Sequence, residues 1–385
     1  MSAEPGREPR PAPADPYRAR RRRLADWLVE QGLEAAVLAD FEGLRNASVR
    51  YLTGHPMDAL LVLAASGEAR LVPWDVSLAA RRARVEEILP YTRFGRSLAQ
   101  ALKELLPARG LSRVELSASF PHPLVRELAA ALPGIRLECR DDGFDEHVAE
   151  LRAIKDEAEL EALRAACRLT DELAEAAGER LAGGWCPSET ELALFLEAEA
   201  RSRGAEGMAF ETLAAGPKRS FAIHAFPPYT AAPFGAKGFS ILDFGVCWEG
   251  YRSDVTLTVI RGPLSARQER MRETVTAAYG RALAQVKPFA DPRGIATDID
   301  RFLEEAGFPM PHGLGHGIGL EAHEAPYLST RRAAPPPPLR PGMVVTIEPG
   351  VYDPEAGGIR LENDVLITAD GHEVLTRARL LELEA

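Results

Sequence analysis

The sequence predicts an α+β protein of two domains, a smaller α/β domain followed by a larger domain made of two similar halves. Its 385 residues are long for one domain and comfortable for two. Short apolar runs alternate with helix-like segments up to about residue 140, which is typical of an α/β domain with a central sheet. After a long helical segment, an order of helices and then strands occurs twice, which indicates an internal duplication.

Residues 1–16 are predicted to form a disordered tail, because they are rich in Pro, Ala and charge and have little apolar surface to offset the entropy of ordering. Arginines at 18 and 20–23 then precede a moderately apolar helix at 24–31, and not the long uncharged run of an export signal. No apolar run reaches the roughly 18 to 20 residues of a membrane span. We therefore expect no export, no membrane partner and a cytoplasmic location.

The first domain, residues 17–145, is predicted from helices that alternate with short strand-like runs. The strand-like runs are 35–39, 59–65, 69–72, 114–116 and 135–139, the helices after 24–31 are near 77–89 and 123–132, and a YLTG motif stands at 51–54. Nothing in this domain suggests a catalytic constellation. We expect it to shape or cover a site, or to form an oligomer contact.

The second domain, residues 146–385, begins with a long predicted helix at 145–181 that glycines and a proline end. Two capping boxes, Ser188 with Glu191 and Ser265 with Gln268, each predict the start of a further helix. Helices are expected up to about residue 286 and near 294–306, and strands at 208–213, 238–244, 251–260, 344–347 and 358–367.

Charge and cysteine content exclude some classes of protein. Lysine and arginine number 46 and aspartate and glutamate 57, and the net charge of −11 gives no general attraction for nucleic acid. We expect no nucleic-acid partner. The four cysteines are scattered without a CxxC pair, which is typical of reduced thiols in the cytosol, and none is expected to be catalytic.

Four carboxylates stand on predicted strands, where an unpaired acid is rare. Asp243 ends the apolar run FSILDFG, and Asp254 follows in GYRSDVTLTV after a glycine-flanked connection. An antiparallel pairing of these strands would bring the two carboxylates face to face. Glu348 in VVTIEPG and Glu362 in GIRLEND are related in the same way, with glycines and a proline between them.

The stretch HGLGHGIGLEAHEAP, residues 312–326, adds histidines to these acids. His312 and His316 are four apart, but glycine at every second position from 313 to 319 argues against a helix interior. In an extended or irregular backbone, glycine lets the chain pass close to a bound group while an imidazole points into it. The alternative is a glycine-rich surface loop with incidental histidines.

Crowded acids repel one another unless cations neutralise them, so the pattern predicts a site for two divalent metal ions. One imidazole and four carboxylates suit Mn²⁺ or Co²⁺ best, with Zn²⁺ or Fe²⁺ as alternatives. Salt bridges with Arg252 and Arg360 could account for some of the acids, but not for all four.

The order of LDFG, GYRSDVT, HGLGHGIGLEAHE, TIEPG and GIRLEND resembles the pita-bread metallopeptidases, in their Xaa-Pro dipeptidase (prolidase) and aminopeptidase P branch. The resemblance covers most of residues 150–370, and YLTG matches the creatinase-like N-terminal domain that precedes the catalytic domain in the family. It implies a pita-bread fold with pseudo-twofold halves, and a homodimer. It also implies the metal ligands, which would be Asp243, Asp254, His316, Glu348 and Glu362.

The resemblance implies hydrolysis of the peptide bond that precedes proline, in a small peptide with proline at its second position. Glu348 would act as the proton shuttle, and His224 and His323 match the family's two histidines that are not ligands and contact the substrate. A bond before proline is a tertiary amide without N–H, so a pocket fitted to the ring would be needed. Arg331, Arg332 and Arg360 are the candidate substrate-binding arginines, the first two as anchors for the free carboxylate of a dipeptide; a solvated basic pair is the alternative at 331 and 332.

One position departs from the family, since Leu257 stands where the arginine of a Thr-Arg-Thr sequence is usual. Strand alternation places Thr256 and Thr258 on the Asp254 face and Leu257 on the other, so metal binding should survive. The Xaa-Pro dipeptidase is our first prediction. The alternatives are an aminopeptidase P that acts on longer peptides, a creatinase-like or ectoine-hydrolase-like C–N hydrolase, and a pita-bread pseudoenzyme that serves as a binding module.

Overall fold

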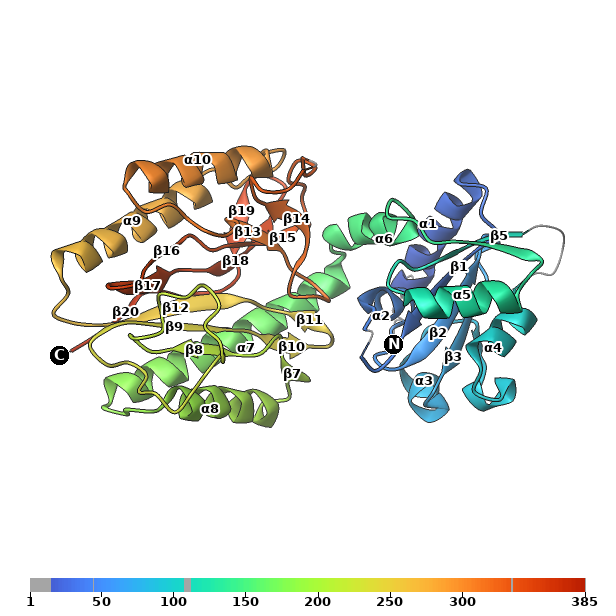
Figure 1. Cartoon of the computed structure of the whole chain (residues 1–385), viewed down its shortest axis with the longest axis horizontal. Coiled ribbons are helices and arrows are strands. Elements are labelled where there is room, and N and C mark those ends of the chain that lie inside the picture. Colours follow the sequence, from blue (N-terminus) through green and yellow to red (C-terminus); the bar gives the residue numbers. More distant parts are fainter. Residues whose placement is uncertain (1–14, 44, 107–111, 334, 385) are drawn as a thin grey trace, which may run out of the picture. The chain divides into compact units, whose positions relative to one another are not determined.

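The computed structural model of the chain describes residues 15–43, 45–106, 112–333 and 335–384 (Figure 1). They divide into two compact units, Met1–Leu151 and Arg152–Ala385. The tail predicted at 1–16 lies outside the described residues except for Asp15 and Pro16, which cap and open the first helix. The predicted boundary between 145 and 146 falls inside α6 (Phe144–Ala153), a few residues before the division between the units. None of the described helices is long and apolar enough to cross a membrane.

The first unit is built around a six-stranded mixed sheet in the order β4-β3-β2-β1-β5-β6. The strands are β1 (Ala35–Asp40), β2 (Ala59–Ala64), β3 (Ala69–Pro73), β4 (Glu87–Ile88), β5 (Ser112–Leu116) and β6 (Ile135–Glu138). The helices are α1 (Pro16–Glu30), α2 (Ala47–Thr53), α3 (Val76–Arg82), the 3-10 helix η1 (Tyr91–Phe94), α4 (Leu98–Leu105) and α5 (His122–Ala131). Every residue of β1 is buried, so the uninterrupted apolar run at 35–39 reflects burial on both faces.

Two predictions for this unit are corrected. The helix expected at 77–89 ends at Arg82, because the following residues pair with the sheet: β4 lies parallel to β3, and the Leu89 N–H donates to the Leu71 carbonyl oxygen. The arginines expected to precede a helix at 24–31 lie within α1. Arg21 is almost fully buried there and donates to the Leu52 carbonyl oxygen at 2.9 Å.

The second unit carries two layers of helices with strands between them, α7 and α8 on one side and α9 and α10 on the other (Figure 1). The helices are α7 (Glu157–Ala182), α8 (Glu189–Ser202), α9 (Ala266–Leu283) and α10 (Pro292–Glu305). The strands of the first half are β7 (Gly207–Met208), β8 (Leu213–Ala215), β9 (Gly238–Phe244), β10 (Val246–Trp248), β11 (Tyr251–Arg252) and β12 (Val255–Arg261). The later strands are β13 (Gly315–Gly317), β14 (Glu324–Leu328), β15 (Val344–Ile347), β16 (Gly350–Asp353), β17 (Gly357–Arg360), β18 (Asn363–Ile367), β19 (His372–Val374) and β20 (Leu381–Leu383).

Each half of this unit packs its helices on its own sheet. Leu173 of α7 and Leu196 of α8 share a core with Leu242 of the sheet β20-β12-β9-β8. Val275 of α9 shares another core with Val345 of the sheet β14-β13-β15-β18-β19. The repeated order of helices and then strands, predicted from the sequence, is therefore present.

The two halves meet where Thr256 forms an isolated antiparallel bridge with Glu362. The Glu362 N–H donates to the Thr256 carbonyl oxygen at 3.1 Å, and Thr258 Oγ1 donates to the Arg360 carbonyl oxygen at 2.8 Å. This seam between the halves brings together strands that are about a hundred residues apart in the chain.

Several predicted elements of the second unit are divided. The helix expected at 145–181 is two helices, because Asp156 and Glu159 form a capping box that starts α7. The strand expected at 208–213 is β7 and β8 with a connection between them. The strand expected at 251–260 is β11 and β12, and that expected at 358–367 is β17 and β18. The last two breaks fall beside Asp254 and at Glu362, so the acids stand at strand ends.

Candidate metal centre and active site

Strands β9 and β12 pair antiparallel, as the sequence predicts, but Asp243 and Asp254 are not directly opposite each other. The register places Asp243 opposite Thr256, and Asp254 stands directly before β12. The connection is closely packed, since a Cβ at Gly245 would lie 1.8 Å from a carbonyl oxygen of the returning chain. Both carboxylates line one cavity.

Glu348 and Glu362 come from the other half of the unit. Glu348 directly follows β15, and Glu362 stands between β17 and β18. Thr256 Oγ1 donates to Glu362 Oε2 at 2.7 Å, across the seam between the halves. The seam therefore brings the carboxylates of the two predicted hairpins to the same cavity.

His316 is held on β13, between β14 and β15. A Cβ at Gly315 would lie 2.0 Å from the Thr346 carbonyl oxygen, and one at Gly317 would lie 2.2 Å from the Ala325 carbonyl oxygen. The alternating glycines are therefore needed for close approach of three backbones, which confirms the prediction of an extended, non-helical segment. His316 Nδ1 lies 3.1 Å from the Gly317 carbonyl oxygen, which fixes Nδ1 as the donor and leaves Nε2 as an acceptor.

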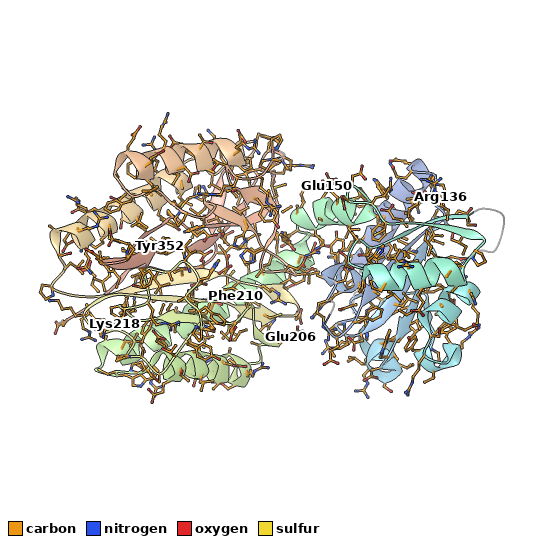
Figure 2. All side chains as sticks on the ribbon, in the orientation of Figure 1. Arg136, Glu150, Glu206, Phe210, Lys218 and Tyr352 are labelled. Carbon is orange, nitrogen blue, oxygen red and sulfur yellow. The ribbon has the colours of Figure 1, made fainter. Side chains whose placement is uncertain are left out.

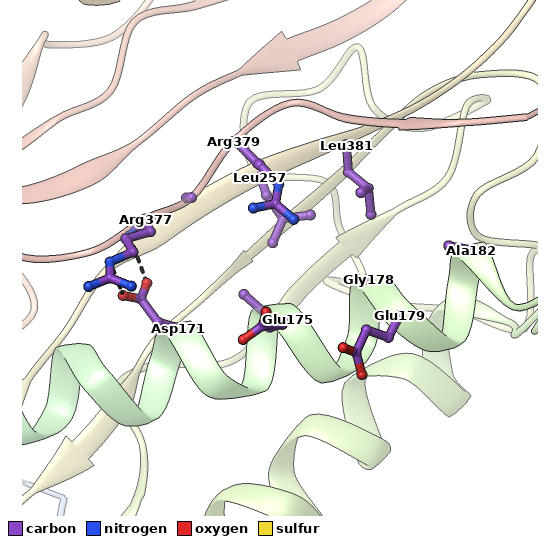
Figure 3. Close-up of a pocket in the computed structure, with 11 residues that line it drawn as sticks. Asp171, Glu175, Gly178, Glu179, Ala182, Leu257, Arg377, Arg379 and Leu381 are labelled. Carbon is purple, nitrogen blue, oxygen red and sulfur yellow. Dashed lines mark hydrogen bonds and ion pairs between the residues drawn. The ribbon is translucent and has the colours of Figure 1, made fainter.

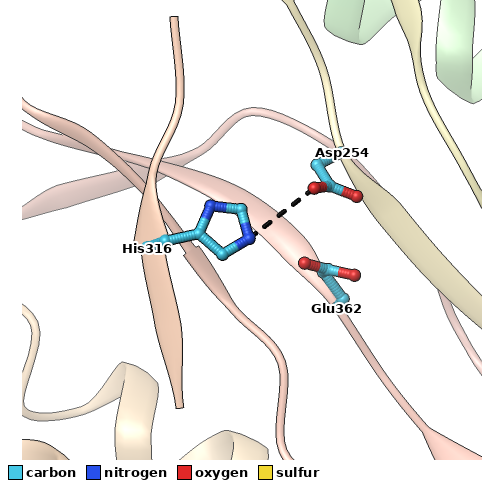
Figure 4. Close-up of side chains that lie close together, drawn as sticks. All are labelled: Asp254, His316 and Glu362. Atoms are coloured by element: carbon cyan, nitrogen blue, oxygen red, sulfur yellow. Dashed lines mark ion pairs between the residues drawn. The ribbon is translucent and has the colours of Figure 1, made fainter. Parts of the chain in front are cut away.

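Figure 4 shows His316 directed towards the carboxylates of Asp254 and Glu362. One ligand atom from each of these three residues lies within 4.8 Å of the others. His316 Nε2 is 3.7 Å from Asp254 Oδ2 and 3.6 Å from Glu348 Oε1. The three side chains are almost completely buried, so a cation among them would have carboxylate oxygens and an imidazole nitrogen in place of water.

Asp243 has one oxygen paired and one free. Its Oδ2 accepts a hydrogen bond from Arg360, whereas its buried Oδ1 has no hydrogen-bond partner in the described part of the chain. A buried carboxylate oxygen without a donor is costly unless a cation meets it. The residues present thus fit a divalent metal centre.

Burial raises the pKa values of the acids in the cluster, and the charge of Arg360 offsets this effect only in part. Burial raises the pKa of Asp254 and Glu348 well above the usual range, and the charge of Glu362 adds to both effects. Burial, followed by the charge of Asp243, raises the pKa of Glu362 to about 7. Burial, followed by His323, lowers the pKa of His316 to about 3, so the imidazole is neutral and able to bind a metal.

The two histidines predicted to contact substrate line the same cavity. His323 stacks at a tilt on His316, with ring centroids 4.0 Å apart, and burial lowers its pKa. His224 is exposed at the cavity wall. The structure thus places both imidazoles next to the carboxylate cluster.

The arginines predicted to bind substrate are placed differently from one another. Arg360 lines the cavity, but Arg331 and Arg332 do not. Arg331 donates to the carbonyl oxygens of His312 and Met310, and the Arg332 guanidinium lies 3.6 Å above the Tyr327 ring. The contact of Arg331 or Arg332 with a substrate carboxylate therefore stays a prediction.

Tyr352, labelled in Figure 2, was not predicted as part of the site, yet its hydroxyl joins Arg360 to His312. The hydroxyl accepts from Arg360 at 2.8 Å and lies 2.9 Å from His312 Nε2. Burial raises its pKa to about 12, so it stays a neutral donor. Its sequence context, GVYDP, carries no signal that would have identified it, because both partners are distant in the chain.

Comparison with known proteins identifies the family to which this geometry belongs. Residues 161–369, more than half of the chain, match metallopeptidase family M24. The chain belongs to metallopeptidase family M24. Residues 20–154 match the creatinase/prolidase N-terminal domain, so the N-terminal domain expected from the YLTG motif is present as well.

Relatives of this M24 chain include an Xaa-Pro dipeptidase of Pyrococcus horikoshii, which is 29% identical over 360 residues, covering 92% of this chain and 96% of the relative. A putative dipeptidase of Bacillus subtilis is 30% identical over 377 residues, with coverage of 92% and 96%. Among solved structures, the prolidase from Pyrococcus horikoshii OT3 has a TM-score of 0.83 at 26% identity and covers 94% of this chain and 99% of that one. The X-Pro aminopeptidase from Thermotoga maritima has a TM-score of 0.78 at 26% identity, with coverage of 92% and 98%. The predicted pita-bread fold is confirmed.

Leu257 lies on the far side of the sheet from the metal centre of this M24 chain. It lines a separate cavity of about 340 Å³ together with α7 and the segment that contains Arg377 and Arg379 (Figure 3). Thr256 and Thr258 make their contacts on the opposite face, at Glu362 and Arg360. The predicted alternation is therefore correct, and Leu257, where the sequence departs from the family pattern, lies on the face of β12 opposite to Thr256 and Thr258.

A buried ion cluster holds the segment of this M24 chain that carries His316 and His323, which we call the histidine segment. Glu324, which follows His323, accepts from Arg152 at 2.5 Å and from Lys155 at 2.9 Å. Although burial alone raises the pKa of Glu324, Lys155 and Arg152 together lower it, so the carboxylate is ionised. The cluster therefore connects the residues that precede α7 with the histidine segment.

Proposed function

We propose that the chain is a dinuclear metal-dependent Xaa-Pro dipeptidase, which hydrolyses the peptide bond preceding proline. The observation that carries the proposal is the convergence of Asp254, His316 and Glu362, whose ligand atoms lie within 4.8 Å of one another. Asp243 and Glu348 line the same cavity and would complete a set of five ligands. The likeness to Xaa-Pro dipeptidases along almost the whole chain supports the substrate class.

The cofactors would be two divalent metal ions, with Mn²⁺ or Co²⁺ as first candidates and Zn²⁺ or Fe²⁺ as alternatives. Four carboxylates and one imidazole are a hard, oxygen-dominated donor set, which favours these ions. When bound, two such ions would polarise the scissile carbonyl and lower the pKa of a bound water.

The side chains of the cavity have separate tasks in the proposed reaction. Glu348 accepts a proton from the attacking water and delivers it to the proline nitrogen as that nitrogen leaves. His224 and His323 donate hydrogen bonds to the substrate carbonyl and to the oxyanion that develops from it. Arg360 orients Asp243 and, through Tyr352, joins His312 to the same set of hydrogen bonds.

The proline ring would be held by the apolar part of the cavity. The cavity has a volume of about 280 Å³, and Leu213, Ala225 and Pro228 are among its lining residues. Recognition of the ring, in place of recognition of a backbone N–H, suits a tertiary amide that has no N–H to donate.

The free carboxylate of a dipeptide would need a cation. Arg331 and Arg332 remain candidates only if their side chains leave the contacts described above. If neither arginine binds the free carboxylate, the enzyme would accept longer peptides and behave as an aminopeptidase P. The likeness to the X-Pro aminopeptidase also suggests this alternative.

A matched pair of substrates tests the proposal. Hydrolysis of Ala-Pro and of Ala-Pro-Ala would be measured with Mn²⁺ or Co²⁺ after prior dialysis against a chelator. We expect metal-restored cleavage of Ala-Pro and little cleavage of the tripeptide. Cleavage of the tripeptide at a similar rate would establish the aminopeptidase P alternative. If neither substrate is cleaved with both ions bound, the proposed peptidase activity would be overturned. The remaining alternatives would then be the C–N hydrolase and the binding module.

We further propose a cytoplasmic homodimer. The resemblance to the family supports the dimer, and the scattered cysteines support a reducing compartment. Light scattering on the purified full chain measures the oligomeric state, and a monomer at micromolar concentration would exclude a stable dimer.

A further inference from the structure

A second cavity adjoins the active-site cavity on the side of α8. It has a volume of about 370 Å³ and shares Phe210 and Glu211 with the active-site cavity. The connection between β7 and β8 carries both shared residues, and Figure 2 labels Phe210 there. We call this second space the side cavity. Because the two cavities share Phe210 and Glu211, the side cavity lies next to the space that a substrate at the metal centre would occupy.

One part of the side-cavity wall is apolar or aromatic. Leu194 of α8 is 52% exposed, and Met208, Phe210 and Tyr229 are half-buried around it. Such a wall suits the methylene stem of a long side chain, and the rings of Phe210 and Tyr229 add a favourable surface for a cation.

The charged part of the wall is acidic in balance. Glu197, Glu206 and Glu211 line the side cavity, and Arg201 is its basic residue. Arg201 is already engaged, because it pairs with Glu197 at 3.0 Å and donates to the Glu206 carbonyl oxygen at 3.3 Å. By contrast, no hydrogen bond or ion pair engages the Glu211 carboxylate within the described ranges of the chain.

Glu211 is also the carboxylate of the active-site cavity that takes no part in the proposed metal ligation. The cavity's other carboxylates are Asp243, Asp254, Glu348 and Glu362. Glu211 thus lies where the active-site cavity meets the side cavity, whose wall is partly apolar and partly acidic. This position suits recognition of a side chain that carries a positive charge at the end of an apolar stem.

We propose that the side cavity binds the side chain of a lysine or arginine that precedes proline, with Glu211 as its charge partner. The proposal rests on the proposed function, since it names the residue preferred at the position before the scissile bond. It assigns Glu211 as a specificity-determining residue and predicts basic-residue–Pro dipeptides as the preferred substrates.

The test compares Lys-Pro with norleucyl-Pro, whose side chain has a similar length and no charge. We expect kcat/KM to be about fivefold higher for Lys-Pro, which is the scale of a partly exposed charge pair, and the ratio to fall with added salt. In Glu211→Gln the ratio should approach one, because the rate on Lys-Pro falls more than the rate on norleucyl-Pro. The matched control is Glu161→Gln, which removes the same charge from an exposed position of α7 that lines neither cavity.

Three outcomes would count against the proposal. Equal rates on Lys-Pro and norleucyl-Pro in the wild type would overturn it and leave the dipeptidase intact. An equal loss on Ala-Pro, norleucyl-Pro and Lys-Pro in Glu211→Gln would show that Glu211 binds the α-ammonium group, and would overturn the side-chain assignment. Failure to cleave any of the three by metal-loaded wild type would overturn the proposed function, and this inference with it.

Discussion

Arg360 and Asp243 form an ion pair inside the candidate metal centre, and the pair leaves Oδ1 of the aspartate without a hydrogen-bond partner among the described residues. The arginine is only 2% exposed. It also donates to Thr256 Oγ1 and to the Tyr352 hydroxyl, both at 2.8 Å. The guanidinium also donates to the Ile223 carbonyl oxygen at 3.2 Å, and with four partners it holds the carboxylate in one orientation and neutralises part of the acidic cluster.

Replacement of Arg360 by methionine is expected to weaken metal binding, because Asp243 loses the group that orients it. Loss of such an outer contact typically lowers metal affinity by about 10- to 100-fold. Metal titration of the dialysed protein measures this effect, and kcat/KM on Ala-Pro should fall with it. Arg301→Met serves as the control, since Arg301 is an exposed partner of Asp298 on α10. Unchanged metal affinity in Arg360→Met would contradict the orienting role.

Replacement of Glu362 by glutamine should remove metal more completely. Glutamine keeps an oxygen for the Thr256 hydroxyl but carries no negative charge. Metal affinity should therefore fall by more than the roughly 10- to 100-fold that is typical when a residue that only orients a ligand is replaced. Elemental analysis after dialysis is expected to find fewer than two ions per chain, together with loss of Ala-Pro hydrolysis. Glu355→Gln, at an exposed turn, provides the control. Two tightly bound ions in Glu362→Gln would exclude this residue as a ligand.

Local patterns in the sequence were enough to predict the main parts of this site. Acids inside apolar strands and glycines at alternating positions mark Asp243 and the His316 segment, because burial and close backbone approach each require particular residue types. The capping boxes at Ser188 and Ser265 are both present, since a helix start depends on neighbouring residues alone. Asp156 and Glu159 carry the same signal, and attention to it would have divided the helix predicted at 145–181.

Contacts between distant segments could not be predicted in this way. Arg360 and Asp243 are 117 positions apart, and no local pattern indicates that they pair. The direction of Arg331 is likewise decided by carbonyl oxygens of the preceding segment, at His312 and Met310. The end of α3 at Arg82 depends on a neighbouring strand that competes for the following residues.

The stability of the metal-free protein should fall as the pH rises from about 5 to 7.5. The Glu362 pKa is raised from the model-compound value of 4.5 to about 7, so the folded state binds the proton more tightly than the unfolded state. Its contribution is fully present below pH 4.5 and is lost as the pH rises through about 7, at roughly 3 kcal/mol for this group. Asp254 and Glu348 act in the same direction.

Urea unfolding at the two pH values, with a chelator present, measures this effect. Protein loaded with metal should show the opposite trend, because the ions bind the ionised carboxylates. In Glu362→Gln the decline of the metal-free protein should be smaller. Metal-free stability that increases over this range would mean that the acids are ionised without a cation.

Gly319→Ala is expected to destabilise the protein and lower its activity together. A Cβ at this position would lie 2.2 Å from Glu324 Oε1, and that carboxylate cannot move aside freely because Arg152 and Lys155 hold it. Overpacking of this kind costs about 1–3 kcal/mol. Since Glu324 directly follows His323, the displacement should also lower kcat on Ala-Pro. The matched control is Gly371→Ala, where a Cβ meets nothing within 4 Å. Equal stability of the two variants in urea unfolding would show that the Glu324 carboxylate moves aside at little cost, and that the ion cluster does not fix the histidine segment.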